Sequence, residues 1–233
     1  MKPEVKVYFL KEYGSWSVLS IAFLTGLGVS RGFSWQTVPL FLSLGLLINS
    51  KQALTKWIRK TGDRTSFLIF LGQIAVAAVI LTVLFGADIM RLLPLLIFPA
   101  GYLLSNKLAG EHGLMTEVLG FALLSLAAVL AKFLITNGLD VRLFVAVALY
   151  FTAGVFKIKA VLRGKMQDRV AAILHVFASV IIYRLMHIPV IILLPLVENI
   201  IASTTLYRVR LRTTGWIEVA KSLAFLWLMI AFF

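Results

Sequence analysis

Cysteine is absent from this chain of 233 residues, and only 14% of the residues carry a charge. Without Cys, the chain can form neither a disulfide framework nor a thiolate metal site. The aspartates are scattered and never paired, so the clustered carboxylates of a magnesium–diphosphate site are missing. The 3 histidines never stand at the i, i+3 or i+4 spacing of a metal-binding or haem-binding pair.

Motifs of the common enzyme classes are also absent. The sequence contains no Walker motif, no Gly-x-Ser-x-Gly nucleophile motif and no His-Glu-x-x-His zinc motif. No apolar segment carries regularly spaced Arg residues, so nothing indicates voltage sensing. P-loop nucleotide hydrolysis, serine hydrolase chemistry and zinc proteolysis are therefore left without sequence support, and no cofactor is indicated.

Apolar residues dominate the sequence: 61% are hydrophobic, and the mean hydropathy is +0.97. A soluble domain of this size would need far more polar surface to cover its core. The apolar residues form uniform runs close to the ~20 residues with which a helix spans a bilayer, rather than the alternating pattern of strands. The composition predicts an all-α integral membrane protein.

Hydropathy windows of about 19 residues predict a bundle of nine transmembrane helices. We expect these helices at residues 15–30, 35–50, 66–86, 90–106, 114–136, 141–157, 170–184, 187–206 and 216–233. Eight helices are an alternative, because the seventh and eighth segments could form one tight hairpin.

Lys and Arg residues account for the formal net charge of +13 and gather in the loops on one side of this layout. The other side carries Arg31, Arg91, Arg142 and Arg184, and Lys132 lies near its helix end, where it can snorkel. The positive-inside rule then predicts a cytosolic N-terminus and an external C-terminus in the cell membrane. Membrane lipids are the expected partners, and nucleic acid is not. The loop charges on the basic side are Lys2, Lys6, Lys11, Lys51, Lys56, Arg59, Lys60, Arg64, Lys107, Lys157, Lys159, Arg163, Lys165, Arg169, Arg208, Arg210, Arg212 and Lys221.

The first apolar run could imitate a signal peptide, but it lacks a small-x-small cleavage site, so we expect it to be retained.

A weak internal repeat runs through what we interpret as one transmembrane domain, residues 1–233. Glu-x-Gly occurs at Glu12 and again at Glu111, and prolines interrupt both the fourth and the eighth segments. This pattern suggests two parallel four-helix units, 11–106 and 110–206, followed by a final helix, 216–233. Parallel repeats are one known plan of transporters.

Glu198 is the most informative single residue, because it lies near the middle of the eighth predicted span. A carboxylate at that depth is costly and usually faces a cavity, a partner or an ion pathway. Asn199 lies beside it, and Pro195 removes a helix hydrogen bond just before it. We predict that Glu198 faces an internal cavity; the alternative is a structural hydrogen bond to a neighbouring helix, for example to Gln73.

Basic residues and helix N-termini at the cytosolic mouth form a second candidate site. Gly14, Gly113 and Gly215 would let an anion approach the N–H groups of helix N-termini there. Together these groups could hold a phosphate, diphosphate or carboxylate headgroup; alternatively, the cations only set topology and contact anionic lipid. The expected basic residues are Lys107, Lys157, Lys159, Arg163, Arg169, Arg208 and Arg210.

Acidic residues in the first turns of odd-numbered helices are explained by the helix dipole alone, although they could also act as ligands or bases. They are Glu12, Glu111, Glu117 and Glu218. His112 is the leading proton-transfer candidate, since its ordinary pKa is near neutrality. We expect His175 to be a buried, hydrogen-bonded histidine and His187 to lie on the outer face.

Three short patches of the sequence are distinctive: Lys11–Trp16, with Glu12, Tyr13 and Trp16, then Tyr150–Arg163, and finally Gly215–Glu218. Together they resemble the YwiC-like family of bacterial multi-pass membrane proteins. The resemblance implies a bacterial inner-membrane protein and adds Tyr13 and Trp16 to the candidate binding residues. The family usually has His where this chain has Tyr13, which weakens any proton-transfer role for this motif.

The nine-helix layout also resembles that of UbiA-type intramembrane prenyltransferases. Those enzymes carry Asp-rich, magnesium-binding motifs in the loops that correspond to Ser50–Arg64 and Lys157–Arg169. Here each loop holds one aspartate, Asp63 or Asp168, among basic residues. A shared fold would therefore not imply metal-dependent prenyl transfer.

The sequence thus favours a cytosol-facing basic pocket that binds an amphipathic anionic or lipid-like small molecule. One form of this function is a UbiA-like transferase without the Asp-rich motifs, in which Glu198, His112 and Glu111 are the candidate catalytic groups. A transporter of small molecules or ions is the first alternative. An assembly factor or subunit of a respiratory complex is the second.

Overall fold

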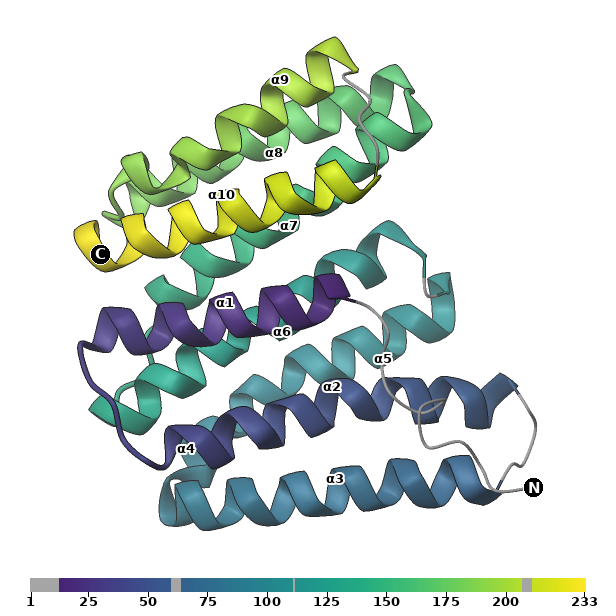
Figure 1. Cartoon of the computed structure of the whole chain (residues 1–233), viewed down its shortest axis with the longest axis vertical. Coiled ribbons are helices and arrows are strands. Elements are labelled where there is room, and N and C mark those ends of the chain that lie inside the picture. Colours follow the sequence, from purple (N-terminus) through teal and green to yellow (C-terminus); the bar gives the residue numbers. More distant parts are fainter. Residues whose placement is uncertain (1–12, 60–63, 111, 207–210) are drawn as a thin grey trace. The chain divides into compact units, whose positions relative to one another are not determined.

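The computed structural model describes residues 13–59, 64–110, 112–206 and 211–233. Within these ranges the regular elements are helices and no strand occurs, which confirms the predicted all-α class. Figure 1 labels α1 (Tyr13–Ser30), α2 (Thr37–Arg59), α3 (Arg64–Phe85), α4 (Ile89–Leu92), α5 (Ile97–Ala109), α6 (Leu114–Thr136), α7 (Val141–Arg163), α8 (Met166–Leu185), α9 (Val197–Thr205) and α10 (Leu211–Phe232). Short 3-10 helices are η2 (Gly86–Asp88), η3 (Leu93–Leu96) and η4 (Val190–Leu196).

Each predicted span coincides with a helical segment of the described chain. Within the described part of the chain, six segments are long and apolar enough to cross a membrane, namely Tyr13–Ser30, Arg64–Phe85, Ile89–Ala109, Leu114–Thr136, Val141–Arg163 and Thr213–Phe232. The apolar segment Val190–Thr205 is shorter. The prediction of a multi-pass helical membrane protein is confirmed, whereas the choice between eight and nine spans stays a prediction.

Two helices continue well beyond their predicted ends. The second span was expected to end near residue 50, but α2 runs to Arg59; the sixth was expected to end near residue 157, but α7 runs to Arg163. Both extensions are rich in Lys and Arg, which are good helix formers and end hydropathy windows without ending a helix. Hydropathy therefore located the apolar part of each helix and missed its basic end.

The described residues form two compact units, and each unit combines parts that are distant in the sequence. In the first unit, which includes Trp16 and Phe33–Pro94, α2 packs along α3. The rings of Trp57 and Phe67 lie 5.1 Å apart, and the Trp16 ring covers Gly45, where a Cβ would come within 3.2 Å of it.

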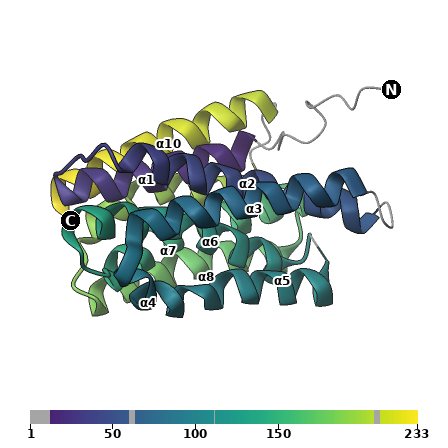
Figure 2. The ribbon, with the colours of Figure 1, turned by 90° about the horizontal axis from the view of Figure 1, so that it is seen from below.

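The second unit contains Ser17–Gly32 and Leu95–Phe233. Here α5 packs on α6, α6 on α7 and α7 on α8, while α9 contacts both α7 and α8. Figure 2 shows α6, α7 and α8 running alongside one another. Glycine or asparagine in the left-handed region ends two of these helices: Asn137 follows α6 and Gly164 follows α7.

Proline breaks the segment that carries Glu198. Residues Val190–Leu196 form the 3-10 helix η4, with Pro189 just before it and Pro195 inside it. The α-helical form resumes at Val197, so Glu198 lies in the first turn of α9.

Glycine allows α1 to lie very close to α6. A Cβ added at Gly26 would come within 2.1 Å of the Ala128 carbonyl oxygen, and within 2.9 Å of the Ala128 Cα. A Cβ at Gly28 would instead meet the flexible side chain of Ile230 on α10. Within the second unit α1 thus packs against both α6 and α10, and its contact with α6 is between backbones.

Asp140 fastens the connection between α6 and α7. Its side chain caps α7 by accepting a hydrogen bond from the Leu143 N–H. It also forms an ion pair with Lys132, whose Nζ lies 2.6 Å from Asp140 Oδ2. Burial alone would raise the pKa of Asp140, but the bonds from Lys132 and from backbone N–H groups outweigh it, so that the pKa lies below its ordinary value of 3.8. Lys132 and Asp140 also line a depression of about 490 Å³, together with Arg142, outside the predicted basic mouth.

Asp140→Asn is expected to lower the free energy of unfolding by about 1 kcal/mol at pH 7, because it keeps the helix cap but removes the ion pair with Lys132 and the negative charge at the N-terminus of α7. Since the folded-state pKa is lowered, the stabilisation is present above the unfolded-state pKa and is lost as the pH falls through the folded-state pKa. Thermal unfolding in detergent at pH 7 and near pH 3 measures this difference. A gap between wild type and variant that stays constant on acidification would contradict it.

Candidate functional site

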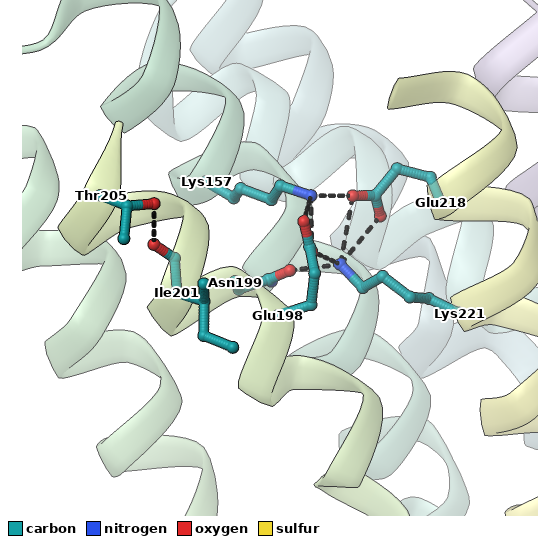
Figure 3. A network of polar contacts seen from close by, with 7 residues as sticks. All are labelled: Lys157, Glu198, Asn199, Ile201, Thr205, Glu218 and Lys221. Carbon is teal, nitrogen blue, oxygen red and sulfur yellow. Dashed lines mark hydrogen bonds and ion pairs between the residues drawn. The ribbon is translucent and has the colours of Figure 1, made fainter. Parts of the chain in front are cut away.

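Three helices of the second unit bring together a network of charged side chains. Helix α7 supplies Lys157, α9 supplies Glu198 and Asn199, and α10 supplies Glu218 and Lys221, as Figure 3 shows. We call these five residues the lysine–glutamate network. Glu198, the carboxylate predicted to lie near the middle of a span, is at the centre of this network.

Short ion pairs connect the network. Lys157 Nζ donates to both Glu198 oxygens, at 2.7 and 2.6 Å, and to Glu218 Oε1 at 2.6 Å. Lys221 Nζ donates to Glu198 Oε2 at 2.7 Å and to Glu218 at 3.1 and 3.3 Å. It also donates to Asn199 Oδ1. Each ammonium group therefore bridges the two carboxylates.

Burial is uneven across the network. The side chains of Lys157 and Lys221 are only 5% and 9% exposed, whereas those of Glu198 and Glu218 are 31% and 33% exposed. Buried charges are tolerated when they are paired and hydrogen-bonded. Two ammonium groups and two carboxylates give the network a formal charge of zero, so the group as a whole can be buried.

Buried polar atoms without hydrogen-bond partners lie in and near this network. They are Asn199 Nδ2 and Ser203 Oγ, while the Tyr150 hydroxyl lies close to Ser222 of α10. Tyr150 lies two helical turns before Lys157 on α7, and its ring stacks on Phe225 of α10 at 3.8 Å. Ser203 follows Asn199 by one turn of α9. An unpaired buried polar group costs about 1–3 kcal/mol, and such groups usually pair with water or a ligand.

Lys159 belongs to a separate ion pair. Its Nζ lies 2.9 Å from Glu117 on α6 and donates to the His112 carbonyl oxygen at 3.3 Å. Residues two apart on a helix point in nearly opposite directions, so Lys157 and Lys159 bind different neighbours. The basic cluster expected at the mouth is divided in this way, and Glu117 and His112 lie with Lys159 rather than with Glu198.

The other predicted site residues lie outside both ion pair groups. Arg169 donates to the carbonyl oxygens of Ser203 and Thr204 at 2.8 and 2.6 Å and so binds the end of α9. Arg163 lies 4.0 Å from Asp168 across the α7–α8 turn. Lys107 is exposed at the end of α5, and Tyr13 is also exposed, while Trp16 packs on Gly45. Glu12, Glu111, Arg208 and Arg210 lie outside the described residues.

The contacts of Glu198 and His175 bear on two predictions about single residues. Glu198 is bound by Lys157 and Lys221 of neighbouring helices, and its facing a cavity stays a prediction. His175 is half-buried, and its predicted hydrogen bonding is confirmed by Thr152 and the Leu149 carbonyl. The His187 carbonyl accepts a bond from Arg142, near the Asp140 end of α7.

Lys221 is the member of the lysine–glutamate network that the sequence prediction did not include among the candidate site residues. Counting it among the loop charges was wrong, because it is buried inside α10. The signal was available: Lys221 lies within the predicted span 216–233 and three residues after Glu218. A lysine inside an apolar span, one turn from a carboxylate, indicates a polar network rather than a loop. Nothing in the sequence marked Tyr150 or Ser203.

Metal binding has little support in this network, since lysines occupy both of its carboxylates. Among the residues that the structure describes, no three His, Asp or Glu side chains are grouped as metal ligands would be.

Comparison with known proteins gives one family match. The family model described as YwiC-like protein matches residues 10–132, which is more than half of the chain. No curated protein matches, and no solved structure does either. Of the three patches that suggested this resemblance, Lys11–Trp16 lies within the matched range, whereas the residues of the lysine–glutamate network follow it.

Proposed function

This chain belongs to the YwiC-like protein family, and we propose that it binds an amphipathic anionic or lipid-like small molecule in the cell membrane, at the lysine–glutamate network. The observation that carries this proposal is the pair of buried ammonium groups next to unpaired polar atoms, in particular Asn199 Nδ2. The ammonium groups would hold an anionic headgroup, and Asn199 would donate a further hydrogen bond to it.

The position of the network along the helices favours entry of the headgroup from the cytosol. Lys157 lies six residues before the end of α7, or about 9 Å at the helical rise of 1.5 Å per residue. The positive-inside rule places that end of α7, and with it the N-terminus, on the cytosolic side. Arg163 and Arg169 lie near this end of α7, while the stacked rings of Tyr150 and Phe225 are buried deeper in the bundle.

The test is native mass spectrometry with lipid extraction on protein purified gently from its own membranes, followed by titration with decane-1-sulfonate. Lys157→Gln removes charge-assisted hydrogen bonds worth about 1.5–3 kcal/mol and is expected to weaken sulfonate binding by about 10–100-fold. Lys107→Gln removes an exposed charge at the same end of the molecule and is expected to bind as wild type does.

Equal losses in the two variants would mean that only the general positive charge matters. A wild-type protein that retains no anionic molecule and binds no sulfonate would overturn the proposal. Co-purification with partner subunits, in place of a ligand, would point to the assembly of a larger complex.

Transport is a second candidate, favoured by the break at η4 and Pro195 directly before Glu198. Irregular backbone next to a buried charge is a recurring feature of transporter binding sites, and a 3-10 segment within a helix often marks a hinge. Movement of decane-1-sulfonate across vesicle membranes that contain the protein would support transport. Binding without movement would instead favour an intramembrane enzyme that uses the same site.

A further inference from the structure

We propose that anion binding at the lysine–glutamate network is coupled to the uptake of one proton, which Glu218 receives. This inference rests on the proposed function, because it concerns the same site. To the proposed anion binding it adds a coupled ion, the proton, and the residue that binds this proton, Glu218.

Charge balance is the first argument. Two lysines and two glutamates sum to zero, and the lysine side chains are almost fully buried. A monovalent anion that entered unaccompanied would leave the network with a charge of −1 at low dielectric, where an uncompensated charge is strongly disfavoured. One proton bound together with the anion restores neutrality, so the stable ligand-bound state is the protonated one.

The contacts identify Glu218 rather than Glu198 as the proton acceptor. Glu198 accepts three bonds of 2.6 to 2.7 Å from the two lysines. Glu218 accepts one bond of 2.6 Å and two weaker ones of 3.1 and 3.3 Å, and it lies in the interior of α10. The Glu218 carboxylate is therefore the one whose charge is less stabilised.

The groups around Glu218 are consistent with this exchange. Helix α7 presents Lys157 and the Tyr150 hydroxyl, α9 presents Glu198, and Lys221 lies one turn along α10 itself. The segment η4, which also packs on α10, contains only apolar residues and Pro195. The repulsion between Glu198 and Glu218, both bound to the same two lysines, further favours protonating one of them.

The exchange conserves charge and atoms. A proton from the cytosol binds one carboxylate oxygen of Glu218 and converts it to a neutral carboxyl group. Lys157 and Lys221 then direct the N–H bonds that they gave to Glu218 toward an oxygen of the incoming anion, while their bonds to Glu198 remain. The network begins with two positive and two negative charges, and it ends with the same totals.

Calorimetric titration with decane-1-sulfonate tests the coupling, because the charge of a sulfonate is constant between pH 6 and 8. The protein is held in lipid nanodiscs, and the titration is repeated in buffers with different ionisation enthalpies. We expect one proton taken up per sulfonate bound and an affinity about tenfold lower for each unit of pH increase. Decanol, the uncharged analogue, is expected to bind without proton uptake.

Glu218→Gln imitates the protonated carboxyl group and is expected to bind sulfonate without proton uptake and independently of pH. Glu117→Gln, in the separate Lys159 pair, is the matched control and should retain uptake. Sulfonate binding by wild type without proton uptake, or uptake that persists in Glu218→Gln, would overturn the coupling while leaving the binding function intact. No sulfonate binding by wild type at any pH would overturn the proposed function. The wild-type measurement decides the matter even if Glu218→Gln fails to fold.

Discussion

Glu198→Leu is expected to lower the free energy of unfolding by about 3 kcal/mol, because it leaves two buried ammonium groups with a single carboxylate between them. For a chain of this length such a loss corresponds to a decrease of about 6–12 °C in the midpoint of thermal unfolding. Thermal unfolding of purified protein in a mild nonionic detergent measures it directly.

Lys221→Met supplies the control for that prediction. On its own it removes the ammonium group that binds Glu198, Asn199 and Glu218, and it should also destabilise the protein. In the double variant with Glu198→Leu, one Lys157–Glu218 pair remains and the network is again neutral. We expect the double variant to be more stable than Glu198→Leu alone. Strictly additive losses would show that the lysines and glutamates do not compensate one another's charge.

Gly26→Ala should have an effect of similar size for a different reason. Its Cβ would come within 2.1 Å of the Ala128 carbonyl oxygen, which is backbone and cannot rotate away. Helices α1 and α6 would have to separate, and we expect a loss of about 3 kcal/mol, the upper end of overpacking costs. The unfolding midpoint and the yield of folded protein should both fall.

Two other glycines provide matched comparisons for Gly26. At Gly28 the added Cβ meets the Ile230 side chain, which can change rotamer, so Gly28→Ala should be milder. At Gly154, in α7, a Cβ meets nothing within 4 Å, and Gly154→Ala should be neutral or stabilising by about 0.5–1 kcal/mol. If all three substitutions had the same effect, the close approach of α1 and α6 would not be what limits Gly26.

Hydropathy and charge in the sequence were sufficient to predict the helical segments and to select Glu198. A carboxylate in an apolar run is conspicuous whatever its partners are, and Pro195 marked the break before it. The basic ends of α2 and α7 were missed because hydropathy windows detect the apolar part of a helix and not its hydrogen bonds. The ends of these helices depend on helix propensity and backbone hydrogen bonds, which a hydropathy scale does not include.

The partners of Glu198 could not be predicted, because they come from α7 and α10, at separations of 41 and 23 residues. The sequence does not distinguish a lysine in a loop from a buried one. Only the packing of the helices shows that Lys157 and Lys221 are buried whereas Lys107 is exposed. The separation of Lys157 from Lys159 depended on the same missed extension of α7. Because the helix continues to Arg163, these two lysines point in nearly opposite directions and contact different neighbours.

Pairing between α7, α9 and α10 also bears on how this protein enters the membrane during synthesis. A charged residue near the middle of a helix adds about 2.5–3.5 kcal/mol to the cost of inserting that helix alone. Helix α10 carries Glu218 and Lys221 one turn apart, so it offsets much of this cost internally. The short segment Val190–Thr205 carries Glu198 without an opposite charge of its own, and its compensating lysine, Lys157, has already been synthesised in α7. Because α7 precedes α9 in the sequence, Lys157 is synthesised before Glu198, the carboxylate whose charge it compensates.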